Sequence, residues 1–273
     1  TKDVNALVTF VDPTTGALRV ATGSRDKTVR VWDAETGGVL LVIDVGSGVK
    51  ALAFFADPAT GAPRLACGTA KRDRRGKVVG GDVRAFDPVA GGEALIVIDM
   101  SVGKLAVFTD QATGAPRLAC TSGKKVLILD PVVGGEALVV IDVGSYVEAL
   151  AVFADPATGE LRIACGCADG EVRIYDPAAG GEALVVLEGH TDWVRALTVF
   201  TDRATGALRL ASGSDDRSVR IWDLTAGGAA RFVLEGHTGY VYALTAFADP
   251  ATGETRLASL SRDKTVRVWD ASK

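Results

Sequence analysis

The chain has only two histidines, His190 and His237, and histidine is the residue best suited to acid–base chemistry near neutral pH. A catalytic histidine works beside a nucleophile, a carboxylate or a metal, and many such sites leave a local motif. The sequence has no GxSxG and no HExxH, and Gly123-Lys124 lacks the upstream glycine of a phosphate-binding loop. The sequence therefore favours a structural role for both histidines and predicts that the protein is not an enzyme.

Six dipeptides of an aromatic or apolar residue followed by aspartate recur at steps of 54, 43, 46, 47 and 47 residues. They are Trp32-Asp33, Phe86-Asp87, Leu129-Asp130, Tyr175-Asp176, Trp222-Asp223 and Trp269-Asp270. Such a period indicates one supersecondary unit used repeatedly, whose copies stack because no single copy can bury its own apolar face. Since acidic residues recur at equivalent turns and strand ends, paired carboxylates need no catalytic explanation.

Each copy contains short apolar runs separated by Gly, Asp, Thr and Ser. In the fifth copy these runs are Val194–Phe200, Leu208–Ser212, Val219–Asp223 and Ala230–Glu235, which predict a four-stranded meander. The link between the first two runs, DPATGELR in the fourth copy, predicts a turn in which Asp caps and Gly supplies a positive φ. No window has helical periodicity free of Gly or Pro. We expect an all-β chain that forms a single domain over residues 1–273.

Copies five and six place Gly189-His190 and Gly236-His237 before the first strand and end in Trp-Asp. This pattern resembles the WD40 repeat family over almost the whole chain. The resemblance implies a six-bladed β-propeller with a buried hydrogen-bond tetrad in each well-formed blade. By alignment, the tetrads would be His190, Ser212, Asp216 and Trp222 in blade five, and His237, Ser259, Asp263 and Trp269 in blade six. Asp would select the histidine tautomer, and Ser would pass the hydrogen bond to the indole N–H.

The other blades depart from this pattern. Blade one keeps Thr22, Asp26 and Trp32 without a preceding Gly-His, and blades two to four carry Cys at the serine position. Only Asp169 in blade four still matches the tetrad aspartate, so we expect apolar packing to hold these blades.

The last blade is predicted to be incomplete. The sequence offers only five fourth strands, so the sixth blade either has three strands or is completed from outside this segment. An open edge invites strand addition, and the alternatives are then a homo-oligomer or a fragment of a larger propeller.

In the resembling family, the loops before the first strand and between the second and third strands form the rim of one face, where protein or peptide partners dock. The residues at these positions are Tyr146, Glu148, Trp193, Arg195, Tyr240 and Tyr242, with Arg25 and Arg262 in the turns. Aromatic and Arg side chains are enriched among the energetic anchors of interfaces. The sequence thus predicts a non-catalytic interaction scaffold. The alternative is that these aromatic rings only pack against the edges of neighbouring blades and bind no partner.

Blade two carries a basic insertion, residues 71–81. Its cations are Lys71, Arg72, Arg74, Arg75 and Lys77. Such a cluster could hold a phosphate, an acidic segment or nucleic acid. The net charge of −4 and the lack of interleaved aromatics favour a solvated flexible loop instead, so nucleic acid is not the favoured partner.

Four cysteines, Cys67, Cys120, Cys165 and Cys167, include no CxxC pair. We interpret them as small buried thiols and expect no metal and no other cofactor. No apolar run is long enough for a membrane helix, and the opening residues do not have the pattern of a signal peptide. We therefore expect an intracellular, cytoplasmic protein without a membrane partner.

Overall fold

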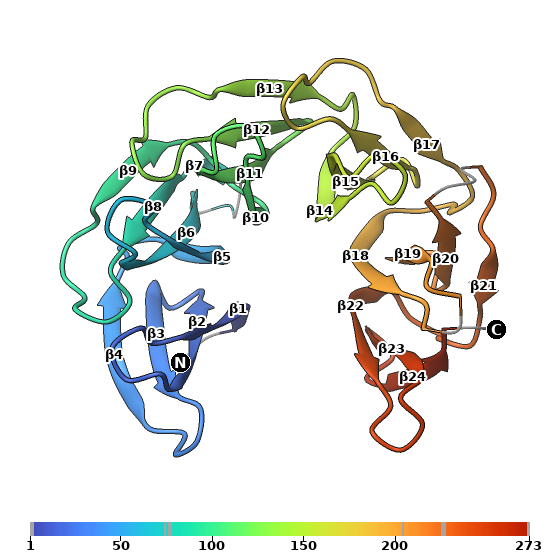
Figure 1. The fold of residues 1–273 in the computed structure, drawn as a ribbon, viewed down its shortest axis with the longest axis horizontal. Helices are drawn as coiled ribbons and strands as arrows, with labels where there is room; N and C mark the ends of the chain where they lie inside the picture. Colours follow the sequence, from blue (N-terminus) through green and yellow to red (C-terminus); the bar gives the residue numbers. More distant parts are fainter. Residues whose placement is uncertain (1–2, 74, 76–77, 204, 225–227, 272–273) are drawn as a thin grey trace. The chain divides into compact units, whose positions relative to one another are not determined.

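The computed structural model describes residues 3–73, 75, 78–203, 205–224 and 228–271. Within this part of the chain every regular element is a β-strand, and the strands form six antiparallel sheets (Figure 1). We call these sheets blades one to six in chain order. The chain divides into two compact units, residues 1–140 and 141–273.

The first unit contains blades one and two and most of blade three. Blade one has the order β1 (Val4–Val11), β2 (Leu18–Ser24), β3 (Thr28–Asp33) and β4 (Val39–Asp44). Blade two has β5 (Gly48–Ala56), β6 (Pro63–Arg72), β8 (Asp82–Phe86) and β9 (Ile96–Asp99), with the short β7 (Val78–Gly80) paired to the end of β6. Blade three has β10 (Leu105–Thr109), β11 (Pro116–Ser122), β12 (Lys125–Leu129) and β13 (Val139–Asp142), which contains the boundary between the units.

The second unit contains blades four, five and six. Blade four has β14 (Val147–Ala154), β15 (Leu161–Cys167), β16 (Val172–Tyr175) and β17 (Val185–Leu187). Blade five has β18 (Val194–Thr201), β19 (Leu208–Ser214), β20 (Val219–Asp223) and β21 (Phe232–Leu234). Blade six has β22 (Val241–Ala248), β23 (Thr255–Ser261) and β24 (Val266–Asp270), and it has three strands in the described part of the chain. The predicted meander and the shortened last blade are therefore confirmed.

In blades one to five, the second and third strands carry most of the buried core. In blade five, Leu210 of β19 and Trp222 of β20 are fully buried and pack in one cluster with Val194 of β18. Cys67 and Cys120 occupy the buried position that Ser212 has in blade five, each opposite the middle of the third strand. Burial raises the pKa of the Cys67 thiol to about 12, so this group stays protonated and unreactive at neutral pH.

The link between the first two strands folds as the Asp-x-x-x-Gly pattern predicts. In blade one, Asp12 Oδ1 accepts the backbone N–H of Thr14 at 2.9 Å, and the Asp12 carbonyl accepts the N–H of Gly16 at 2.8 Å. Gly16 has a φ of 70°, which a residue with a side chain adopts only with strain. The aspartate therefore closes the turn and the glycine returns the chain to β2.

An arginine on the second strand pairs with the aspartate of the Trp-Asp-type dipeptide in every blade, and in blades one to four and six it also pairs with the aspartate of the link. In blade three, Arg117 lies 3.4 Å from Asp110 of the link and 3.0 Å from Asp130 at the end of β12. The ion pair with the dipeptide aspartate is also made by Arg19, Arg64, Arg162, Arg209 and Arg256. The recurring aspartates thus have a structural partner, which the sequence analysis did not identify, although an Arg follows the link in every copy.

Candidate functional site

Both histidines lie in continuous hydrogen-bond chains. In blade five, His190 Nδ1 lies 2.7 Å from Asp216 Oδ2, and His190 Nε2 lies 2.8 Å from Ser212 Oγ. Trp222 Nε1 donates to the same Ser212 Oγ at 2.8 Å. One assignment satisfies every group: Nδ1–H donates to the carboxylate, the Ser212 hydroxyl donates to Nε2, and the indole N–H donates to the hydroxyl oxygen.

Blade six repeats this geometry. His237 lies 2.8 Å from Asp263 and 2.7 Å from Ser259, whose hydroxyl oxygen accepts the Trp269 indole N–H at 2.7 Å. Both histidines are buried, and both of their ring nitrogens are engaged. Each tetrad therefore joins three segments of its blade, and no ring nitrogen is left to act as an acid or base on a ligand.

The tetrad carboxylates are strongly stabilised in their charged form. Burial raises the pKa of Asp216, but hydrogen bonds from His190 and Ser218 outweigh it and hold the pKa well below its ordinary range. The hydrogen bond from Thr265 and that from His237 lower the pKa of Asp263 in the same way. The histidines are thus held in one orientation by carboxylates that stay ionised at any physiological pH.

In blades two and four, which lack the histidine, an arginine of the third strand pairs with an aspartate. In blade two, the buried Asp82 accepts a hydrogen bond from Thr69 Oγ1 at 2.6 Å and one from Arg84 at 2.8 Å. In blade four, Arg173 donates to Asp169 at 2.7 Å. Arg84 and Arg173 stand opposite the cysteine that replaces the tetrad serine. The apolar packing expected in blades two and four is therefore supplemented by these Arg–Asp ion pairs.

Three aromatic residues of the second unit occupy the same position in consecutive blades. Tyr146, Trp193 and Tyr240 directly precede β14, β18 and β22, and the carbonyl of each accepts an N–H at 2.9 Å from the turn between the second and third strands. The donors are Ala168, Asp215 and Arg262. These bonds fix the backbone that carries the rings. The rings themselves are exposed: Tyr146 by 56%, Trp193 by 36% and Tyr240 by 47%, and Tyr242 on β22 by 49%.

Arg195 connects blades four and five on this surface. Its guanidinium donates to Asp215 at 2.7 and 3.0 Å and to Glu148 of β14 at 3.2 Å. The hydrogen bond to Asp215 raises the pKa of Arg195, so the cation is permanent. The same guanidinium lies 4.3 Å from the centre of the Trp193 ring. The structure thus brings Glu148, Trp193 and Arg195 into one cluster with Asp215. We call these four residues, together with Tyr146, Tyr240, Tyr242 and Arg262, the rim surface.

Comparison with known proteins identifies the repeat. The family model described as WD domain, G-beta repeat matches residues 1–33, 181–223 and 228–270. The chain contains WD40 repeats. The first matched segment covers β1 to β3 of blade one, the second runs from β17 of blade four to β20 of blade five, and the third runs from β21 of blade five to β24 of blade six. Each matched segment ends at a Trp-Asp dipeptide.

A solved structure supports the propeller assignment. A chain from the crystal structure of BBS1N in complex with ARL6DN, soaked with lead, aligns with a TM-score of 0.74 over 99% of this chain and 80% of that chain. Its sequence identity is 14%, so this likeness concerns the fold alone. The fold class of this WD40-repeat protein is all-β, with six propeller blades. No curated protein matches the sequence.

The basic insertion of this WD40-repeat protein is partly regular. β6 extends to Arg72 and pairs with β7, so the flanks of the insertion form strands where a flexible loop was the favoured expectation. Lys71 lies 3.9 Å from the buried Asp82, and the backbone N–H of Arg75 donates to Asp73 at 2.8 Å. Arg74, Lys77 and the side chain of Arg72 lie outside the described residues. Arg25, in the first unit, lies 3.2 Å from Asp3, and both are exposed.

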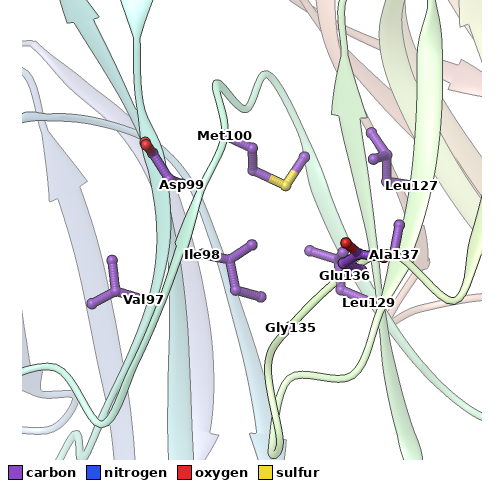
Figure 2. Close-up of a pocket in the computed structure, with 9 residues that line it drawn as sticks. All are labelled: Val97, Ile98, Asp99, Met100, Leu127, Leu129, Gly135, Glu136 and Ala137. Carbon is purple, nitrogen blue, oxygen red and sulfur yellow. The ribbon is translucent and has the colours of Figure 1, made fainter.

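A cavity of about 410 Å³ lies between β9 and β12 of the first unit (Figure 2). Ile98 and Met100 form one wall, and Leu127 and Leu129 form the other. Leu127 stands opposite Cys120, at the position where blades two and four have their paired arginines. The cavity therefore marks the place where blade three lacks a polar pair, and its lining is mostly apolar, with Asp99 and Glu136 as its two charged residues.

Two further absences concern only the described residues. No three His, Cys, Asp or Glu side chains there are grouped in a way that could hold a metal ion. In the same part of the chain, no helix has the length and apolar character needed to cross a membrane.

Proposed function

We propose that this WD40-repeat protein is an interaction scaffold that binds a protein or peptide on the rim surface. WD40 propellers in general mediate contacts between proteins and are non-catalytic. The observation that supports the proposal here is the row of exposed aromatic side chains, Tyr146, Trp193 and Tyr240, on backbones held by hydrogen bonds.

The chemistry of these residues suits binding. Large aromatic rings bring much apolar area to an interface at a low cost in conformational entropy, because few side-chain torsions are immobilised. Trp193 is further ordered by the Arg195 guanidinium beside its ring. A partner would therefore meet a surface that is already arranged, which lowers the entropic cost of association.

The test compares the wild-type chain with the Trp193→Ala/Tyr240→Ala variant as immobilised baits in a source lysate. We expect a protein that is retained by wild type and lost by the variant, with little change in Tm, because both side chains are exposed. The matched control is Val186→Ala/Val233→Ala, which removes exposed apolar side chains from the outer strands β17 and β21 of blades four and five. Equal retention by wild type and the rim variant would contradict the proposal.

A second candidate function is assembly through the open edge of blade six. Val219 and Ile221 of β20 pair with β21 and are fully buried, whereas Val266 and Val268 at the equivalent positions of β24 are 62% and 61% exposed. An unpaired strand of this kind is a template for an added strand. We expect the mass in solution to exceed that of a monomer and to fall when a peptide of residues 230–235 is added. If the protein is a monomer in solution and does not bind this peptide, assembly through blade six is excluded.

The remaining alternatives have less support. Nucleic-acid or phosphate binding would depend on the insertion at 71–81, and its cations lie partly outside the described residues. An intracellular, cytoplasmic location is proposed from the four free and buried cysteines.

A further inference from the structure

The rim of blade six differs from that of blade five in its charges. Apart from Glu188 and the tetrad residue Asp216, which have the acidic equivalents Glu235 and Asp263 in blade six, the charged residues of the blade-five loop, first strand and turn are Asp192, Arg195, Asp215 and Arg217. The residues at the equivalent positions of blade six are Gly239, Tyr242, Arg262 and Lys264, as the identical registers of the two hairpins show. In blade five, the negative charges of the two acids balance the positive charges of the two bases at these positions. Blade six has two bases and no acid at these positions.

In blade five the central cation is already neutralised. Arg195 makes hydrogen-bonded ion pairs with both Asp215 and Glu148, and its guanidinium lies over the Trp193 ring. An incoming acidic group would have to compete with two carboxylates for this arginine. Blade five therefore offers a partner an ordered aromatic surface but little net attraction for charge.

In blade six the cations are not neutralised by the nearby acid. The Asp263 carboxylate lies between Arg262 and Lys264 in the sequence, but it accepts hydrogen bonds from His237, Thr265 and the backbone of Thr238. The side chains of Arg262 and Lys264 are exposed, and neither lies within 4.0 Å of a carboxylate oxygen in the described part of the chain. Their positive charge faces solvent, and the backbone N–H of Arg262 donates to the carbonyl of the exposed Tyr240.

Backbone packing keeps an acid from the place where blade five has one. A Cβ atom on Gly239 would lie 2.6 Å from the backbone nitrogen of Asp263 and 3.2 Å from Arg262 Cβ. The first contact is with backbone, which cannot move aside cheaply. An aspartate at this position, equivalent to Asp192, would therefore require the turn to shift. The turn that presents Arg262 lies directly against the loop that presents Tyr240, and their backbones are hydrogen-bonded.

We propose that the partner bound by the rim surface is a peptide segment that places an acidic side chain against Arg262 and Lys264 of blade six, while an apolar side chain packs on Trp193. This inference rests on the proposed function and assigns the chemistry of the partner. The two cations attract a carboxylate, and Tyr240 and Tyr242 shield the contact from water.

The test uses a random dodecapeptide library displayed on phage, selected on the immobilised full chain. We expect the retained peptides to carry Asp or Glu at a constant spacing from an aromatic or large aliphatic residue. The Arg262→Glu/Lys264→Glu variant should bind these peptides roughly five- to tenfold more weakly, because rim charges each contribute modestly, and should select basic peptides instead. The matched control, Lys125→Glu/Arg231→Glu, makes the same change of net charge at exposed positions outside the rim surface.

Three other outcomes are distinguishable. Some selected peptides could lack acidic residues and bind through Trp193. If the Arg262→Glu/Lys264→Glu change did not alter their affinity, this inference would be overturned and the proposed scaffold function would stand. If the control variant bound the peptides as weakly as the Arg262→Glu/Lys264→Glu variant, the loss of affinity would be an effect of net charge, and the inference would also be overturned. A library from which no peptide is retained by wild type would contradict the proposed function together with the inference.

Discussion

The guanidinium of Arg195 lies 4.3 Å from the centre of the Trp193 ring, and its hydrogen bonds to Asp215 and Glu148 hold it there. The indole is thus kept in place by a cation that two other segments position. One exposed tryptophan is in this way ordered before any partner arrives, which bears directly on the first prediction.

Removing this cation should expose Trp193. In Arg195→Ala, we expect collisional quenching of tryptophan fluorescence by acrylamide to increase, since one face of the indole loses its cover. Of the other tryptophans, Trp222 is fully buried and Trp32 and Trp269 are partly buried, so Trp193 should dominate the change. Arg231→Ala, which removes an exposed arginine lying 5.2 Å from the Phe232 ring, is the control and should leave quenching unaltered. Unchanged quenching in Arg195→Ala would show that Arg195 does not order Trp193.

Removing the tetrad hydroxyl should destabilise blade five. Ser212→Ala leaves the Trp222 indole N–H and His190 Nε2 without partners in the core, and we expect the free energy of unfolding to fall by about 1–3 kcal/mol. The measurement is urea denaturation followed by tryptophan fluorescence.

Ser212→Cys is the informative companion to this variant. It introduces the residue that blades two to four carry at this position, and a thiol is a weaker hydrogen-bond donor than a hydroxyl. We expect a loss smaller than that of Ser212→Ala. A Ser212→Ala chain as stable as wild type would contradict the role assigned to the tetrad.

The tetrad aspartates should make the protein sensitive to acid. The pKa of Asp216 is lowered in the folded state relative to about 3.9 in an unfolded chain, because its hydrogen bonds from His190 and Ser218 outweigh the effect of burial. A lowered pKa contributes stability that is complete above the unfolded-state value. This contribution is lost as the pH falls from about 4 toward the lower folded-state value. Thermal denaturation at a series of pH values below 5 should therefore show a falling Tm.

Asp216→Asn separates this effect from general acid denaturation. The variant should be less stable than wild type at neutral pH, and the difference should shrink as the pH falls through that window, because the wild-type carboxylate becomes protonated there. A difference that stays constant with pH would indicate that the carboxylate charge does not stabilise the tetrad.

Much of the fold could be predicted because its determinants are local. The alternation of apolar residues in Val219–Asp223 defines β20, and the Asp-to-Gly link defines the turn from β1 to β2 through contacts within five residues. The tetrads could be proposed from the spacing of His190, Ser212, Asp216 and Trp222, since each blade repeats the same registers. That the six blades form a single domain stays a prediction.

The partners of individual charges could not be predicted in this way. The pairing of Asp82 with Arg84 was missed because the insertion in blade two moves this aspartate out of its expected place in the repeat. The arginines of the second strands recur in every copy, but the sequence does not say which of several acids each one contacts.

By itself, the sequence determined the repeat, the all-β class and the positions of the strands, because strand alternation and turn chemistry act between residues close together in the chain. Only the tertiary structure decided which charges are neutralised. Arg195 and Glu148 are 47 residues apart and meet because β14 and β18 lie side by side. Arg262, at the position equivalent to Asp215, meets no acid among the residues that the structure describes, because the carboxylate next to it in sequence is turned inward to His237.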